Sequence, residues 1–526
     1  MPVTATWTPA VQFPEAARIG QPTPELLRRF ADAGPDRVRV IDAEHRLTAS
    51  TLLSAVAMNQ ERLRTAGVRR GDVVCMQIPN WWEAVALAHA VWGMGGILCP
   101  VPVNFRAAEI ASILSAAPVA AYVAAESYRN VEYPPLIAGA MRRSAVRAPV
   151  LAVPHAGPAA EAGPGAGGRP ELVADLDAVC MLMFTSGTTG RPKGVLHSHR
   201  TLLAEARSIA DLFSMREDRV YMPSPVSHIT GLVYGVVMPL VMDGTVILQA
   251  GWDPDTGAAL VERHRCTVCV GATPFLRGLS DASRRRGQPS ALRAFICGGA
   301  DVPPSLVREA ERSLGAVVVR AYGLTEMPTV SCGGPGDGPG VRAGTDGRLT
   351  GSSQARLARA VDGVGELEVR GPELCLGYLD PADTAAAFTP DGWFKTGDLA
   401  RLGPGRTVTI AGRMKDIVVR GGENISAKEV EDYLAEHPGI AEVAIVGVPD
   451  PVLGERACAF VVASGPAPSL ADISAYLTGR DIAKHKAPEH LIIVGDLPRT
   501  PSGKIQKFLL RRDAPELLAA GRGQSR

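Results

Sequence analysis

The residues whose types and spacing could do chemistry are densest in one loop near position 185. Residues 181–195 read MLMFTSGTTGRPKGV, an apolar run followed by hydroxyl residues, glycines and a lysine. Glycines let backbone amides approach an anion closely, hydroxyls donate further hydrogen bonds, and a lysine adds positive charge. The loop is therefore predicted to bind a polyphosphate through Thr185, Ser186, Gly187, Thr188, Thr189, Gly190 and Lys193.

The spacing of this loop distinguishes it from two other phosphate-binding motifs. A Walker-type loop needs a glycine, four residues and then Gly-Lys-Ser/Thr. Here two residues separate Gly187 from Gly190, and glycine follows Lys193. The sequence also lacks a convincing strand-to-helix G-x-G-x-x-G turn with an acid about 20 residues further on. A P-loop NTPase and a dinucleotide oxidoreductase are both disfavoured.

Further short motifs follow the loop in order. They are PVSHITG at 225–231, CGGA at 297–300, AYGLTE at 321–326, KTGDLA at 395–400, GRMKDIVVRGGENISAKEVE at 412–431 and PRTPSGKIQK at 498–507. The set resembles the AMP-forming adenylating superfamily, which includes acyl-CoA synthetases, firefly-type luciferases and the adenylation domains of nonribosomal peptide synthetases. Within it, the chain looks most similar to cyclohexanecarboxylate-type or medium-chain acyl-CoA ligases.

The resemblance implies ATP and Mg²⁺ as ligands and gives each motif a role. Glu326 is expected to hold Mg²⁺, because a carboxylate suits a hard cation, and Thr325 is expected to contact the α-phosphate. Asp398 is expected to accept hydrogen bonds from the ribose, with Arg413 near the same sugar. An aromatic face and a turn without large side chains would enclose adenine. The residues implied there are Tyr322, Gly323, Gly298, Gly299 and Ala300.

The acid and the thiol acceptor are assigned by the same resemblance. Lys504 is expected to be the mobile catalytic lysine, whose ammonium offsets developing negative charge, and His228 is expected at the mouth of the acyl pocket. Gly421 and Gly422 would line the tunnel for the pantetheine arm of coenzyme A. The remaining pocket candidates are mostly uncharged and indicate an apolar acid, whether alicyclic, medium-chain, aromatic or terpenoid-like. They are Tyr234, Gly271, Thr273, Cys297, Met327 and Pro328.

The elements that must position these residues read as α/β. Short runs rich in Val and Ile, such as VVCMQIP and TVCVGA, alternate with stretches of helical spacing. A chain of 526 residues exceeds what one core usually supports, about 250–300 residues, and predicts several domains. The resemblance implies a large N-terminal domain over 1–414, with two doubly wound α/β subdomains plus a distorted β-barrel. A small, mobile α+β domain over 415–526 would follow, hinged at Lys415.

Composition limits the partners and the compartment. Lys and Arg number 55 against 54 Asp and Glu, so no strong overall charge attracts nucleic acid or an anionic membrane. Nine cysteines, an odd number, and an N-terminus unlike a signal peptide favour the cytoplasm. The apolar stretch 85–103 contains glycines, prolines and a histidine, and is predicted to be a buried helix-turn-strand rather than a membrane span. A homodimer is compatible with the sequence.

Several alternatives stay open at this point. The chain could perform only thioesterification of a supplied adenylate, load a carrier protein instead of coenzyme A, or bind adenylates without turnover. Intact Glu326, Asp398 and Lys504 argue against the last. Two features that look like metal ligands are discounted, because no further ligand lies at metal spacing. The Cys266/Cys269 pair is predicted to be buried thiols, and His197 and His199 are predicted to be polar residues at a helix start.

Overall fold

The computed structural model describes residues 3–6, 13, 19–42, 45–155, 168–185, 192–287, 290–299, 302–421, 423–480, 482–500, 503–521 and 523–525. The chain divides into two compact units, each described by itself. The first contains Met1–Gly299, Leu306–Gln354 and Val369–Phe394, and the second contains Ala300–Ser305, Ala355–Glu368 and Lys395–Arg526. A larger and a smaller unit agree with the predicted architecture. The boundary at 414/415 and the hinge at Lys415 stay predictions.

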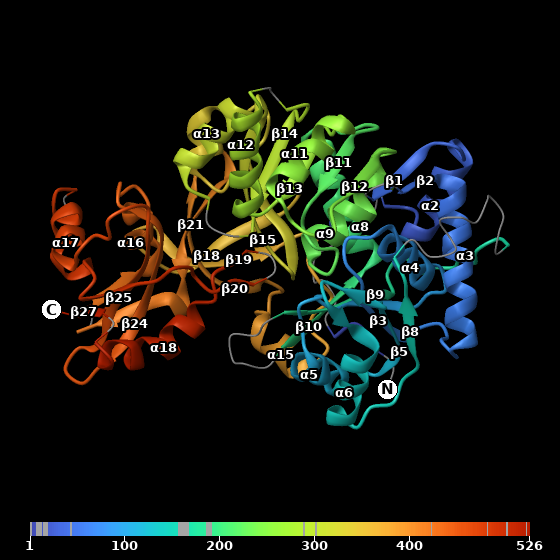
Figure 1. The fold of residues 1–526 in the computed structure, drawn as a ribbon, viewed down its shortest axis with the longest axis horizontal. Helices are drawn as coiled ribbons and strands as arrows, with labels where there is room; N and C mark the ends of the chain where they lie inside the picture. The colour runs from blue at the N-terminus through green and yellow to red at the C-terminus, as the bar shows by residue number, and fades with distance from the viewer. Residues whose placement is uncertain are drawn as a thin grey trace. The chain divides into compact units, whose positions relative to one another are not determined.

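One mixed sheet of the first unit has the order β10-β9-β4-β3-β5-β8 (Figure 1). Its central strands are parallel and almost entirely buried, which is why they read as continuous apolar runs. The strands are β3 (Val73–Gln77), β4 (Ile97–Pro100), β5 (Val119–Ala125), β8 (Val150–Val153), β9 (Val179–Thr185) and β10 (Lys193–Ser198). The intervening helices are α3 (Ala49–Thr65), α4 (Trp82–Gly93), α5 (Ala107–Ala116) and α6 (Tyr133–Ser144).

A second set of strands in this unit has the order β17-β16-β15-β14-β13-β11-β12-β1-β2. From β1 to β15 the neighbours in this order pair in parallel, as expected from alternating strands and helices. The strands are β1 (Val38–Asp42), β2 (His45–Thr48), β11 (Arg219–Met222), β12 (Thr245–Leu248), β13 (Val268–Gly271), β14 (Ala294–Gly298), β15 (Val317–Leu324), β16 (Met327–Cys332) and β17 (Arg348–Leu349). The connecting helices include α8 (His199–Leu212), α11 (Pro254–Arg263), α12 (Thr273–Arg286) and α13 (Pro304–Leu314).

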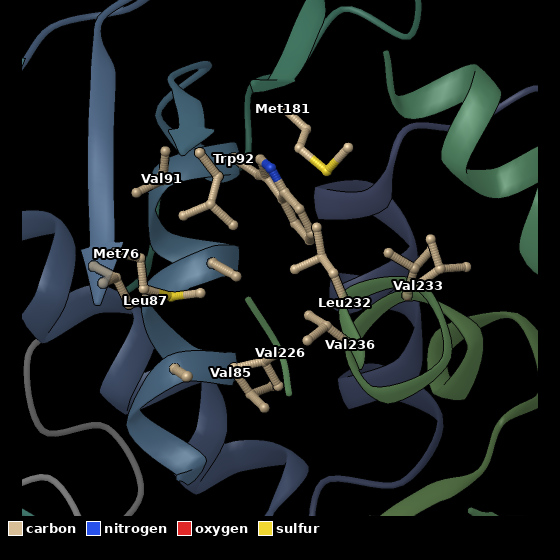
Figure 2. Packing of buried hydrophobic residues seen from close by; sticks show 14 of the residues in the cluster. Met76, Val85, Leu87, Val91, Trp92, Met181, Val226, Leu232, Val233 and Val236 are labelled. Carbon is tan, nitrogen blue, oxygen red and sulfur yellow. The ribbon is translucent and has the colours of Figure 1, made fainter. Parts of the chain in front are cut away.

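Helix α4 is central to the first unit's hydrophobic core. All 12 of its residues are buried, as expected of a helix that is apolar on every side. Figure 2 shows Val85 and Trp92 of α4 near Leu232 and Val236, which belong to α9 (Ile229–Leu232) and the π-helix η1 (Val233–Val237). The predicted buried helix-turn-strand over 85–103 is confirmed. In the part of the chain that the structure describes, no helix has the length and apolarity needed to cross a bilayer.

The second unit is α+β. One group of neighbouring strands is β18 (Gln354–Val361), β19 (Val364–Arg370), β20 (Phe394–Gly403) and β21 (Thr407–Arg413). A separate sheet has the order β23-β22-β25-β26-β27, with β24 also paired to β25. Its strands are β22 (Ile417–Arg420), β23 (Glu423–Ser426), β24 (Ile440–Asp450), β25 (Gly454–Ala463), β26 (His490–Ile493) and β27 (Gly523–Ser525), with helices α16 (Ala427–Leu434), α17 (Leu470–Thr478) and α18 (Lys507–Ala519).

The expected distorted barrel is not found as a closed barrel among the described strands. Every sheet order they form begins and ends on different strands, so the sheets are open. All nine cysteines are free and buried, which confirms the prediction for Cys266 and Cys269.

Candidate active site

The antiparallel hairpin of β9 and β10 brackets the predicted phosphate loop. Thr185 and Lys193 are register partners at its open end, and the Thr185 hydroxyl donates to the Lys193 carbonyl at 3.4 Å. The predicted loop residues between them lie outside the described residues, as do Ala300 and Gly422. The hairpin therefore places the two ends of the predicted loop side by side.

Lys193 is held by two side chains that the sequence did not single out. Its Nζ lies 3.3 Å from Asp383 Oδ1 and 5.1 Å from the centroid of the Tyr378 ring. Asp383 belongs to the first turn of α15 (Pro381–Ala387). A carboxylate and an aromatic face both stabilise an ammonium. Together they keep the positive charge of Lys193 beside the base of the phosphate loop.

Thr325 and Glu326 form the two-residue tip between β15 and β16. Leu324 and Met327 are register partners on either side of them. Gly323 allows this tight approach, because a Cβ built there would lie 1.8 Å from the Pro328 carbonyl oxygen. The predicted metal-holding acid and the predicted phosphate-binding threonine are therefore adjacent at the end of a rigid hairpin.

His197 connects the phosphate hairpin to this tip. Its Nε2 lies 2.9 Å from the Thr325 carbonyl oxygen and its Nδ1 lies 2.9 Å from Thr201 Oγ1. A carbonyl can only accept, so Nε2 carries the hydrogen and Nδ1 is the acceptor. Burial lowers the His197 pKa to about 4, which keeps the ring neutral. The prediction of a polar helix-start residue was wrong for His197, which lies within β10 and is fully buried.

Glu326 has an unpredicted partner in Tyr378. The phenol donates to Glu326 Oε1 at 2.6 Å, and the Cys375 amide donates to the Glu326 carbonyl at 2.8 Å. Burial and the neighbouring carboxylate raise the Tyr378 pKa, so the phenol keeps its proton and donates it. A half-buried carboxylate beside the Thr325 hydroxyl offers only oxygen donors. This donor chemistry fits Mg²⁺.

A buried acid lies behind the same hairpin. Glu205 of α8 accepts from the Tyr234 hydroxyl and, at 3.0 Å, from the Thr329 amide. The Tyr234 Oη also lies 2.6 Å from Thr329 Oγ1. Burial raises the Glu205 pKa to about 7. Tyr234 belongs to a π-helix, an element that is frequent at functional sites, so this predicted pocket residue is fixed by a polar network.

Of the other predicted pocket residues, Gly271, Thr273 and Cys297 lie at or just after the carboxyl ends of neighbouring parallel strands, whereas Met327 and Pro328 begin β16. Gly271 of β13 and Cys297 of β14 are register partners, and Cys297 Sγ lies 4.0 Å from Thr273 Oγ1. His228 caps α9 by accepting the Thr230 amide at 3.3 Å through Nδ1. This edge is where open α/β sheets bind ligands. Gly271, Thr273 and Cys297 therefore lie close together and are uncharged.

The predicted adenine turn lies at the same edge. Gly298 ends β14, and a Cβ there would lie 2.6 Å from the Ala321 carbonyl oxygen, while Gly299 has a φ of +79°. Tyr322 is register partner of Ser331 in the β15–β16 hairpin. Gly298 and Gly299 therefore both favour glycine, and Gly298 is the register partner of Ala321 on the strand that leads to Glu326.

In the second unit, the predicted ribose-binding residues form a pair. Asp398 of β20 and Arg413 of β21 are register partners, and Arg413 Nε lies 3.0 Å from Asp398 Oδ1. The Asp398 side chain is only 6% exposed, and Arg413 supplies the charge that makes this burial tolerable. The sequence-predicted pair is therefore brought together.

Lys504 lies in the same unit among charged side chains. Its amide donates to Thr500 Oγ1 at 3.1 Å and its carbonyl accepts from the Thr500 amide at 2.8 Å, which closes a tight loop. Burial, together with the nearby cations Arg413 and Lys415, lowers the Lys504 pKa to about 7, against the opposing effect of Asp398 and Asp416. The lysine can therefore gain or lose its proton near neutral pH.

Gly421, the described member of the predicted pantetheine pair, lies at the turn between β22 and β23. Its φ of +57° favours glycine, and its amide donates to the Leu453 carbonyl at 2.7 Å. The turn is thus tied to the segment that precedes β25.

The chain is similar to known proteins over most of its length. The family model described as AMP-binding enzyme matches residues 27–379, and that described as AMP-binding enzyme C-terminal domain matches 429–504. The medium-chain fatty-acid–CoA ligase of Escherichia coli (strain K12) is 33% identical over 92% of this chain and 89% of the relative. The 3-[(3aS,4S,7aS)-7a-methyl-1,5-dioxo-octahydro-1H-inden-4-yl]propanoyl:CoA ligase of Mycobacterium tuberculosis (strain ATCC 25618 / H37Rv) is 34% identical over 93% of this chain and 98% of the relative. The crystal structure of ATP-bound MatB from Rhodopseudomonas palustris has a TM-score of 0.83 at 27% identity, covering 94% of this chain and 99% of that one.

Proposed function

The chain belongs to the AMP-binding enzyme family and is an AMP-forming acid–thiol ligase, and from this premise we propose how its residues act and which acid it takes. It uses ATP, Mg²⁺ and coenzyme A to activate a carboxylic acid as its acyl-adenylate and to transfer the acyl group to the thiol. The observation that carries the assignment of residues is the His197 hydrogen bond, which joins the phosphate hairpin to the Thr325–Glu326 tip.

In the first half-reaction a carboxylate oxygen bonds to the α-phosphorus of ATP and pyrophosphate leaves, so one anion must approach another. Thr185, Lys193 and the loop between them are proposed to hold the phosphates, and Thr325 to contact the α-phosphate. Glu326 is proposed to hold Mg²⁺, which supplies Lewis-acid charge neutralisation when bound. Lys504, as an ammonium, is proposed to bridge the carboxylate and a phosphate oxygen.

The sugar, the base and the thiol are assigned to further residues. Asp398, with Arg413 beside it, is proposed to accept hydrogen bonds from the ribose hydroxyls. Tyr322 is proposed to pack against adenine. In the second half-reaction the thiol attacks the acyl carbonyl and AMP leaves. Gly421 is proposed to line the path of the pantetheine arm, and rotation about Lys415 to exchange the two half-reactions.

The acid is proposed to be apolar and either medium-chain or ring-bearing. The two relatives above are named for a medium-chain fatty acid and for a propanoyl group on a fused ring. The predicted pocket residues Gly271, Thr273 and Cys297 are uncharged and gathered at one strand edge. We also propose that the protein is located in the cytoplasm, because its nine cysteines are free thiols. A homodimer stays a prediction.

A substrate panel tests this proposal. Purified protein is incubated with ATP, Mg²⁺, coenzyme A and one acid at a time from aliphatic, alicyclic, aromatic and terpenoid sets. Acid-dependent AMP release should accompany a coenzyme A thioester detected by mass spectrometry. Acid-dependent pyrophosphate exchange without a coenzyme A thioester would favour a carrier-protein acceptor, and thioester formed only from a supplied adenylate would favour the single half-reaction. The proposal would be contradicted if no acid in the panel gave either AMP release or a thioester.

A further inference from the structure

Residues 375–379 lie between the phosphate hairpin and the Glu326 tip and are hydrogen-bonded to both. On one side the Leu376 amide donates to the Leu196 carbonyl at 2.7 Å, and the Leu379 amide donates to the Gly194 carbonyl at 2.7 Å. On the other side the Cys375 amide donates to the Glu326 carbonyl at 2.8 Å. These residues, called the bridging segment below, therefore connect two motifs that are far apart in the sequence.

The backbone of the bridging segment has little conformational freedom. Gly377 has a φ of +90°, and a Cβ there would lie 2.5 Å from Thr6 Oγ1. The Tyr378 amide donates to Thr384 Oγ1 at 2.9 Å, and the Tyr378 carbonyl accepts from Thr6 Oγ1 at 2.6 Å. Both backbone groups of Tyr378 are thus fixed, which fixes the starting point of its side chain.

The side chain of Tyr378 then makes two different contacts. Its hydroxyl donates to Glu326 Oε1 at 2.6 Å, while its ring face lies 5.1 Å from Lys193 Nζ. The ring is buried, with 4% exposure, so neither contact competes freely with water. A hydrogen bond to one oxygen sets the plane of a carboxylate, and partners of this kind tune how ligating carboxylates bind metal.

We propose that Tyr378 is a positioning residue of the ligase, which orients the Glu326 carboxylate toward the metal–nucleotide complex through its hydroxyl and supports Lys193 through its ring. The inference rests on the proposed function, because Glu326 is assigned to Mg²⁺ there. It predicts that the hydroxyl alone, and not the packing of the ring, determines the Mg²⁺ requirement for ATP binding.

Tyr378→Phe tests the hydroxyl, because it keeps the ring and its packing. ATP binding is measured by isothermal titration calorimetry at a series of Mg²⁺ concentrations, without acid or coenzyme A. The expected result is an increase of about 10- to 100-fold in the Mg²⁺ concentration that gives half-maximal ATP affinity. Tyr128→Phe is the matched control, since its hydroxyl donates to the Ala250 carbonyl at 2.8 Å, and it should leave this concentration unchanged.

A double-mutant cycle distinguishes orientation of Glu326 from a general structural role. In a Glu326→Gln background, Tyr378→Phe should no longer change the Mg²⁺ dependence, because the group it orients is absent. An unchanged Mg²⁺ dependence in Tyr378→Phe, or an equal loss in both backgrounds, would overturn the inference and leave the proposed function intact. A wild-type protein whose ATP binding ignores Mg²⁺ would instead contradict the assignment of Glu326 and, with it, this inference.

Discussion

The first unit holds the Thr325–Glu326 tip with buried neutral groups, whereas the second unit surrounds Lys504 with charges. His197 and the phenol of Tyr378 donate to the tip from neutral rings. Lys504 instead shares its surroundings with two cations and two carboxylates. Neutral hydrogen bonds are directional and fix geometry, while burial and the balance of nearby charges set a pKa.

This difference indicates a division of labour. Removing a buried hydrogen-bonding partner leaves its mate unsatisfied, which costs about 1–3 kcal/mol, so the tip of the first unit is rigid. In the second unit, Arg413 makes the burial of the Asp398 carboxylate tolerable, and burial together with the surrounding charges brings the Lys504 pKa close to neutral pH. The charges of the second unit therefore set a protonation state as well as forming an ion pair.

The largest effect is expected from Lys504→Ala. Loss of the ammonium should reduce acid-dependent pyrophosphate exchange by about 10²–10³-fold, the usual effect of removing one charge-stabilising donor. Thioesterification of a chemically supplied acyl-adenylate should change by only a few-fold. Lys486→Ala, which removes an ion pair with Glu429 at 2.7 Å, is the control and should alter neither reaction. Equal loss of both half-reactions would contradict the assignment of Lys504 to the adenylation step.

A smaller effect is expected at His197. His197→Leu removes the hydrogen bond to Thr325 and should lower exchange by about 10-fold and the free energy of unfolding by about 1–3 kcal/mol. His197→Gln retains an N–H donor and should recover part of both losses. His89→Leu, a buried histidine of α4 that packs 5.6 Å from Trp92, should change stability but not exchange per folded molecule. Equal exchange in the Leu and Gln variants at position 197 would contradict the positioning role.

The pH dependence of adenylation should report the burial of Lys504 and the charges around it. Its pKa is lowered from 10.5 to about 7, so the cation predominates below pH 7. The value of kcat/KM for pyrophosphate exchange should therefore fall as pH rises above about 7, by at most tenfold per unit. Lys504→Arg, which stays protonated, should lack this falling limb even if its maximum is lower. If the falling limb of the pH profile lay at the same pH in wild type and in Lys504→Arg, it would belong to the titration of another group.

The smallest effect on activity is expected from Glu205→Gln. The Glu205 pKa is raised from 4.5 to about 7, so its protonation stabilises the native state fully below pH 4.5 and this contribution is lost as pH rises to 7. Glutamine is neutral throughout, and the variant should be more stable than wild type by about 1–3 kcal/mol at pH 8, with a smaller difference at pH 5. Urea unfolding at the two pH values measures this. A difference independent of pH would contradict the assignment.

The sequence was more informative about site residues that lie within one short motif than about partners that lie far away in the chain. Thr185 pairs with Lys193, Thr325 and Glu326 form a two-residue turn, and Asp398 pairs with Arg413, while the roles of these residues stay predictions. His197 and Tyr378 were missed in this role, although each contacts the tip directly. A histidine on an apolar strand and a tyrosine after a glycine carry no local signal that names a partner 128 or 52 residues away.

The sequence by itself determined the family of chemistry, because phosphate binding, metal holding and charge neutralisation depend on residue types at short, fixed spacings. Only the tertiary structure decided what holds those groups still. Tyr378 and Glu326, or His197 and Thr325, become neighbours only after strands from distant parts of the chain pair and exclude water. At that point a buried donor must find an acceptor, and the choice of acceptor belongs to the packing rather than to any motif.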